Sequence, residues 1–247
     1  FKSETAEVNN IIGRVTGVTG SDIFGTLESD KSLWLINPNG IAIGDGATID
    51  VNGSLFLSTA DQINSDGSSF SNSTLKSESS LLSFDPVGFG FLDENPFFNS
   101  NSSPSISVDL ASQSDPTVLG RLVISEVTEN LSLVGTGIEL KNGNLHSLFT
   151  GVSLISVGNP IDVNVKVDQL NGLRPNIAGA PDWYGANDEF GLVGFDQGGG
   201  VTIDNFHMPY GHGISDLFVF GRNIDISSSD LDFWKAGAMS EIYGYNL

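Results

Sequence analysis

The sequence predicts an all-β protein of the β-solenoid class. Between residues 33 and 60, short apolar runs alternate with turn residues, and the turns recur about every seven or eight positions. This spacing is too short for βαβ units, because a crossover between parallel strands needs roughly a dozen residues or more. The chain also contains 30 glycines and shows no convincing helical period of apolar residues, which argues against a helical protein.

The clearest corner is the sequence Asn-Pro-Asn-Gly at residues 37–40. Proline holds φ near about −65°, and asparagine and glycine accept left-handed backbone angles. We therefore expect a tight turn between a strand at 33–36 and a strand at 41–43. Asp45-Gly46 and Asn52-Gly53 have the same turn chemistry and predict the next two corners.

The predicted strands are short and follow one another closely. Three of them fill a little over twenty residues, which is the length of one coil in a repeat architecture. The segments 201–204 and 224–227 repeat one pattern, with Ile203 and Ile226 twenty-three positions apart, so a further coil is expected there. The predicted coil strands are 11–15, 23–27, 33–36, 41–43, 47–51, 54–58, one from Ile106, 131–133, 138–140, 152–157 and 161–167.

Two stretches interrupt these coils and predict extra-helical loops or hairpins, at residues 64–104 and 173–200. The first begins with serine and other polar residues and then becomes rich in phenylalanine. Exposed rings would form an aggregation patch, so we expect this aromatic part to fold back onto the solenoid wall. The phenylalanines concerned are Phe84, Phe89, Phe91, Phe97 and Phe98.

Charge and composition exclude several functions. Ten Lys and Arg against thirty Asp and Glu give a net charge of −20, which repels phosphate backbones and anionic lipids and argues against nucleic-acid binding. Cysteine is absent, so there is no disulfide, thiolate nucleophile or cysteine-based zinc site. No apolar run reaches the roughly 18 residues of a membrane-spanning helix, and residues 1–4 do not begin a signal peptide.

A carbohydrate-active β-helix enzyme, either a polysaccharide lyase or a hydrolase, is one alternative. Glycoside hydrolysis needs two carboxylates at a set separation. Acidic residues outnumber basic ones three to one, so acidic clusters arise freely on turns and we favour a surface role for them. His207 and His212 lack a zinc-binding spacing. We expect no catalytic residue, cofactor or metal. The acidic sets considered are Asp225, Asp230 and Asp232, and Asp182, Asp188 and Glu189.

Several motifs between residues 8 and 158 resemble those of one known family. They are Asn10-Ile11-Ile12 with Arg14-Val15-Thr16-Gly17, then Ser21, Ile23, Gly25 and Leu27, the stretch 33–60, the stretch 82–91, and 130–135 with Ile138 and 143–145. Together they resemble the filamentous haemagglutinin N-terminal domain, the secretion domain of bacterial two-partner secretion exoproteins. The most specific part is residues 37–41. Beyond Val157 the resemblance is to further β-helical repeats.

This resemblance implies a right-handed parallel β-helix and a protein that is secreted or displayed on the bacterial cell surface. In that family, an outer-membrane β-barrel transporter with periplasmic docking domains recognises the domain during export. The resemblance also marks a secretion-signal motif, which shapes or displays the signal and is not catalytic. Matched residue by residue, it comprises Asn10, Arg14, Val15, Thr16, Gly17, Asn37, Pro38, Asn39, Gly40 and Ile41.

We therefore expect a single solenoid, with a two-partner-secretion-like domain at 1–158 and continuing coils at 159–247. The expected function is non-enzymatic, with export followed by adhesion or contact through a carbohydrate or protein receptor. A fibre subunit that stacks on itself is a further alternative. The family domain has several dozen residues before the position that matches Phe1, and these supply a cap. We therefore expect the chain to be an excerpt or processed form, or its open end to be covered by another chain. Val18 stands where the family commonly has glycine.

Overall fold

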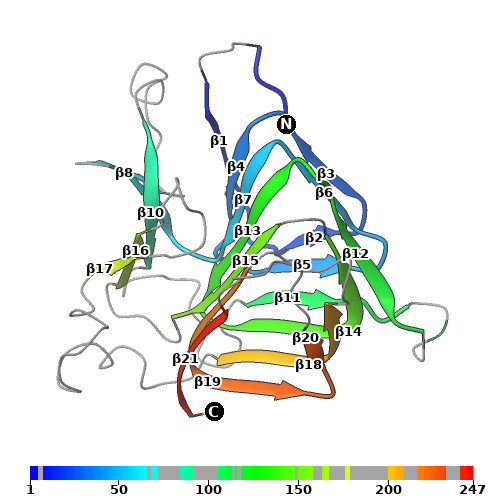
Figure 1. Cartoon of the computed structure of the whole chain (residues 1–247). Helices are drawn as coiled ribbons and strands as arrows, with labels where there is room; N and C mark the ends of the chain where they lie inside the picture. The colour runs from blue at the N-terminus through cyan, green and yellow to red at the C-terminus, as the bar shows by residue number, and fades with distance from the viewer. Residues whose placement is uncertain are drawn as a thin grey trace.

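The computed structural model describes residues 1–4, 8–65, 68–71, 84–91, 105–112, 115, 118–147, 150–157, 163–166, 176–178, 200–208, 216–231 and 240–246. Within these ranges the chain forms strands, turns and bends, with no helix. One sheet has 16 strands, paired in parallel, and a second sheet has five strands, paired antiparallel. The predicted all-β parallel β-helix is confirmed (Figure 1). None of these residues belongs to a helix long and apolar enough to span a membrane.

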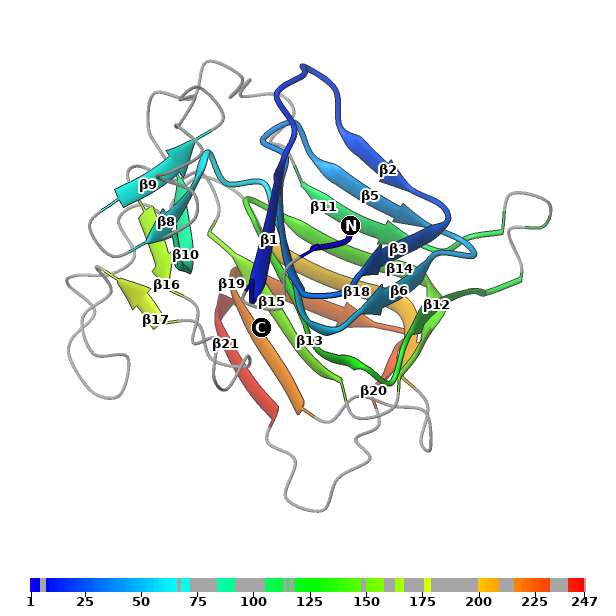
Figure 2. The ribbon, with the colours of Figure 1, turned by 90° about the horizontal axis from the view of Figure 1, so that it is seen from above.

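The 16-stranded sheet winds into a coil with three faces, which are visible end-on in Figure 2. Face A consists of β1 (Asn10–Arg14), β4 (Ser32–Ile36), β7 (Gly53–Ser58), β13 (Thr128–Gly135), β15 (Gly151–Ser156), the first half of β19 (Asp216–Ser227) and β21 (Ser240–Asn246). Face B consists of β2 (Ser21–Ile23), β5 (Ile41–Gly44), β11 (Ile106–Asp109), the first halves of β14 (Ile138–His146) and β18 (Gly200–Met208), and the second half of β19. Face C consists of β3 (Thr26–Ser29), β6 (Thr48–Val51), β12 (Gly120–Ile124), the second halves of β14 and β18, and β20 (Asp230–Leu231).

The strand register confirms the predicted coil length. Ile11 pairs with Leu33, and Leu33 pairs with Leu55, so equivalent residues of these coils lie 22 positions apart. Ile203 pairs with Ile226 in the same way. One predicted strand is divided, because the chain turns a corner between β2 and β3, at residues 24–25. Successive coils pair in parallel on all three faces, which is the stacking expected of a solenoid.

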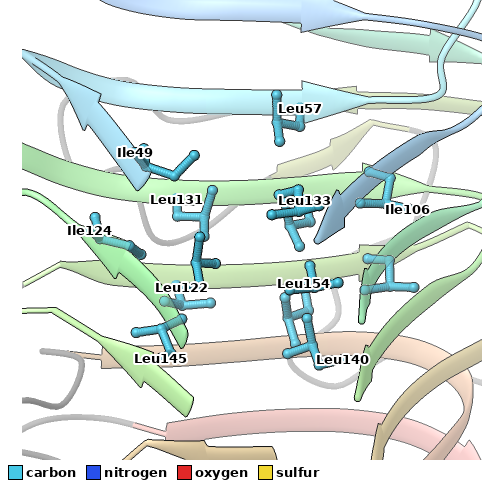
Figure 3. Close-up of a cluster of buried hydrophobic side chains, with 14 of the residues drawn as sticks. Ile49, Leu57, Ile106, Leu122, Ile124, Leu131, Leu133, Leu140, Leu145 and Leu154 are labelled. Atoms are coloured by element: carbon cyan, nitrogen blue, oxygen red, sulfur yellow. The ribbon is translucent and has the colours of Figure 1, made fainter. Parts of the chain in front are cut away.

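Alternate side chains of each face point into the coil and form one continuous apolar core. Leu33, Leu55 and Leu131 make one such column on face A, and all three are buried. Leucine and isoleucine side chains from the other faces belong to the same buried cluster. Figure 3 shows Leu131 and Leu133 of face A beside Leu122 of face C and Leu140 of face B. Each fully buried aliphatic side chain stabilises the fold by about 1.5–3 kcal/mol. The core therefore runs along the axis of the coil.

Left-handed residues make the corner between faces B and C in the later coils. Asn142, Asn205 and Ser228 have φ values of 56°, 51° and 50°, and they let β14, β18 and the β19–β20 connection bend sharply. The side chains also stack. Asn205 Nδ2 donates to Asn142 Oδ1 at 3.3 Å, and Asn142 Nδ2 donates to Asp109 Oδ1 at 3.1 Å. This asparagine ladder satisfies polar groups where the chain leaves the sheet geometry.

The antiparallel sheet lies beside face A and is built from two excursions. Its strand order is β17 (Asn176–Ala178), β16 (Val163–Lys166), β10 (Pro86–Phe91), β8 (Gln62–Ser65) and β9 (Ser68–Ser71). The expectation that 161–167 is a coil strand is wrong for its described part, because β16 pairs antiparallel with β10 outside the coil. Period-two alternation is the same in both settings, so the pattern could not separate them. Most of the two predicted loops, 64–104 and 173–200, lies outside the described residues.

The two sheets meet at a second apolar cluster on the outer side of face A. Phe89 and Phe91 are buried there against Trp34 and Phe56, so the predicted return of the aromatic excursion to the solenoid wall is confirmed for these two residues. The Trp34 ring stacks on Phe56 at 4.0 Å between centroids and lies 5.1 Å from Phe89. Phe97 and Phe98 lie outside the described residues.

Candidate functional site: the corner at residues 37 to 40 and the first strand

The Asn-Pro-Asn-Gly corner joins face A to face B in the second coil. Gly40 N donates to Asn37 O at 3.1 Å, which closes a four-residue turn. Gly40 has φ of 108°, and a Cβ at this position would lie 3.3 Å from Ser105 O in the next coil. Only glycine combines that backbone angle with so close a neighbour. The corner therefore lies close to Ser105, where the chain re-enters the coil after residues 60–104.

Asn37 is the polar centre of this corner and is fully buried. Its Nδ2 donates to Thr19 O at 3.0 Å and to Ser21 Oγ at 2.8 Å, both in the preceding coil. Its Oδ1 accepts from Asn39 N at 2.9 Å, an Asx turn that shapes the peptide around Pro38. Pro38 is buried as well, so the corner is shaped by local bonds and by contacts between coils.

The two predicted motif segments, 10–17 and 37–41, are brought together here. Asn39 Nδ2 donates to Gly17 O at 2.9 Å, and Val15 N donates to Ile36 O at 2.9 Å. Thr16 and Gly17 are exposed on the turn above the corner. Ile41 differs from these residues, because its side chain is buried in the core and its backbone nitrogen donates to Ser105 O at 3.1 Å.

Asn10 and Arg14 lie on β1 and contact the antiparallel sheet instead of the corner. Asn10 Oδ1 accepts from Trp34 Nε1 at 3.1 Å, and Asn10 Nδ2 donates to Asp85 Oδ1 at 3.2 Å. The Arg14 guanidinium lies over the Phe70 ring, 4.5 Å from its centroid, and Nη1 donates to Ser71 O. No sequence pattern indicated Ser71 or Asp85 as partners, because they lie 57 positions from Arg14 and 75 positions from Asn10.

The polar groups at the corner and on β1 form hydrogen bonds within the protein. This arrangement supplies amide hydrogen bonds, one guanidinium and a shaped backbone, without a nucleophile beside a base. Among the acidic residues weighed as catalytic, Asp225 is on face B and Asp230 on face C, while Asp182, Asp188, Glu189 and Asp232 lie outside the described residues. His207 is in register with Asp230, and His212 is not described. In the described part of the chain, no three His, Asp or Glu side chains are grouped to hold a metal ion.

Comparison with known proteins gives one match. The family model described as the TPS secretion domain matches residues 1–205, which contain every residue of the corner and of the first strand. No significant match is found among curated proteins or among solved structures.

Proposed function

The chain belongs to the TPS secretion domain family, and we propose that a dedicated outer-membrane β-barrel transporter recognises it through segments 10–17 and 37–41. Membership makes it the N-terminal secretion domain of a two-partner secretion exoprotein, exported across the outer membrane. Recognition by a transporter is the finer step. It is supported by the family match, which contains both segments. In the folded protein the bond from Asn39 to Gly17 joins the two segments.

The burial of Asn37 says when such recognition takes place. An amide that is fully buried and bonded to Thr19 and Ser21 offers nothing to a partner in the folded state. Before the coils stack, the same segment is an extended chain with free donors and acceptors. We therefore infer that the transporter binds the segment before it folds, and that the corner then closes outside the cell.

The rest of the proposal concerns the mature protein. We propose that it is non-enzymatic, secreted or held at the cell surface, and that its parent serves adhesion or surface contact. The family is a secretion domain, and the side chains at the corner suit hydrogen bonding better than bond cleavage. We also propose that residues 159–247 continue the solenoid beyond the domain at 1–158, and the stacking of β18 and β19 on β14 and β15 supports this continuation. The family match itself extends to residue 205.

The first test is export with and without the transporter. In the producing bacterium, deletion of the transporter gene should leave the protein in the periplasm, while its complementation restores the extracellular protein. Normal appearance outside the cell without the transporter would overturn the proposal.

The second test separates signal from stability. Asn39→Ala and Arg14→Ala are compared with Asn52→Ala, an exposed asparagine at another corner. Export of each variant is measured beside the urea stability of the purified protein. We expect Asn39→Ala and Arg14→Ala to lower export more than their stability loss accounts for, and Asn52→Ala to be exported normally. Export that follows stability alone in all three variants would contradict a role of these side chains in recognition.

A further inference from the structure

We propose that residues 68–71 and 84–85 act as a clamp that covers the export-signal side chains of β1 and so ends recognition once the chain has folded. The inference rests on the proposed function, because it concerns the regulation of the same segment. The clamp is defined by Phe70, Ser71 and Asp85, which hold Arg14 and Asn10.

The side chains of Asn10, Ile12 and Arg14 share one face of β1, because alternate residues of a strand point the same way. That face is turned toward the antiparallel sheet. Ile12 packs against the apolar cluster between the two sheets, and Asn10 and Arg14 bond to groups on either side of it. All three outward side chains of the first strand therefore have contacts in the folded protein, and all three residues are partly buried.

These contacts use the same polar groups of Arg14 and Asn10 that a partner would bind. The guanidinium of Arg14 has an aromatic face on one side and a carbonyl acceptor at Nη1. The amide of Asn10 is used at both ends, since its oxygen accepts from buried Trp34 and its nitrogen donates to Asp85. A transporter strand that reads these groups competes directly with the clamp.

The clamp residues are remote in sequence from the residues they hold. Asp85 lies 75 positions after Asn10, and Ser71 lies 57 positions after Arg14. Whenever residues 68–71 and 84–91 have not packed beside face A, Asn10 and Arg14 lack these partners. Signal access is thus linked to the folding of the excursion, and a folded product cannot rebind its transporter.

The test uses clamp variants that leave Asn10 and Arg14 intact. Phe70→Ala with Asp85→Ala removes the ring and the carboxylate, and Phe70→Leu is a milder variant that keeps apolar volume without a ring face. Leu122→Ala is the matched control. Leu122 is buried on face C, so this substitution weakens the core at a place away from the clamp. Each full chain is refolded, checked by circular dichroism, and applied to immobilised, purified periplasmic region of the transporter.

Opening of the clamp is measured separately. The chain has no cysteine, so Ile12→Cys introduces a single thiol between Asn10 and Arg14, on the face of β1 that the clamp contacts. We expect this thiol to be labelled about tenfold faster in the clamp variants than in the Leu122→Ala background, given the strength of a cation–π contact and a charged hydrogen bond. Equal labelling rates would show that the contacts do not protect β1 and would overturn the inference.

The binding results then divide cleanly. We expect denatured wild type and the folded clamp variants to be captured, and folded wild type and folded Leu122→Ala to pass through. Arg14→Ala added to a clamp variant should abolish its capture. If denatured wild type is not captured, the proposed recognition fails and the clamp has nothing to regulate. If denatured wild type is captured but the folded clamp variants are not, recognition stands and the clamp inference is wrong.

Discussion

The indole nitrogen of Trp34 donates a hydrogen bond to the side-chain oxygen of Asn10, 3.1 Å away. Trp34 is fully buried between Phe56 and Phe89, so its N–H has no access to water. The bond also ties β1 to its neighbour β4 through side chains, in addition to their backbone ladder. A residue of the predicted export motif therefore also has a structural role at the end of the sheet.

Asn10→Ala should destabilise the protein by about 1–3 kcal/mol, because it leaves the buried indole N–H without an acceptor. The measurement is urea unfolding followed by tryptophan fluorescence. Trp34→Phe removes the donor, so the cost of Asn10→Ala should shrink in that background, as a double-mutant cycle reveals. Strictly additive costs would mean that this bond contributes nothing to stability.

Asn37→Ala should lower the free energy of unfolding by about 2–4 kcal/mol, because it removes two donated bonds and the acceptor of the Asx turn from a buried position. Asn52→Ala, at an exposed corner, should change stability by less than about 0.5 kcal/mol. Chemical denaturation of both variants gives the comparison. A similar small loss in the two would contradict the assignment of Asn37 as the polar centre of its corner.

Gly40→Ala should cost more than Gly46→Ala, although both glycines have positive φ, 108° and 78°. A Cβ on Gly40 approaches Ser105 O to 3.3 Å, whereas a Cβ on Gly46 meets nothing within 4 Å. Backbone strain of about 1–3 kcal/mol applies to both, and the added contact applies to Gly40 alone. Thermal unfolding of the pair measures the difference, and equal losses would show that the contact with the next coil is relieved without cost.

Ser228→Asn should stabilise the protein by about 0.5–1 kcal/mol, because asparagine tolerates left-handed φ better than serine and can extend the ladder from Asn205. Asn142→Ala, which breaks the ladder in its middle, should destabilise it by about 1–2 kcal/mol. Urea midpoints of the two variants test the ladder. Loss of stability in Ser228→Asn would place Ser228 outside the stack.

The sequence-based predictions are correct where residues that are neighbours in the chain decide the backbone conformation. The corner at 37–40 follows from the backbone limits of proline, asparagine and glycine, and the 22-residue coil follows from the even spacing of such corners. The alternation at 163–166 was equally clear, yet it described an antiparallel strand beside the coil. Alternation with a period of two residues shows which side chains share a face of a strand. It does not show which strand lies alongside.

The sequence by itself determined the solenoid, its coil length and the tight turn that marks the family, because each depends on short-range backbone preferences repeated along the chain. Only the tertiary structure decided what the motif residues touch. Asn37 reaches back to Thr19 and Ser21, and Arg14 is held by Phe70 and Ser71 from a separate sheet. Such partners depend on how coils and excursions stack in space. Contacts between residues tens of positions apart produce no periodic pattern in the sequence of either partner.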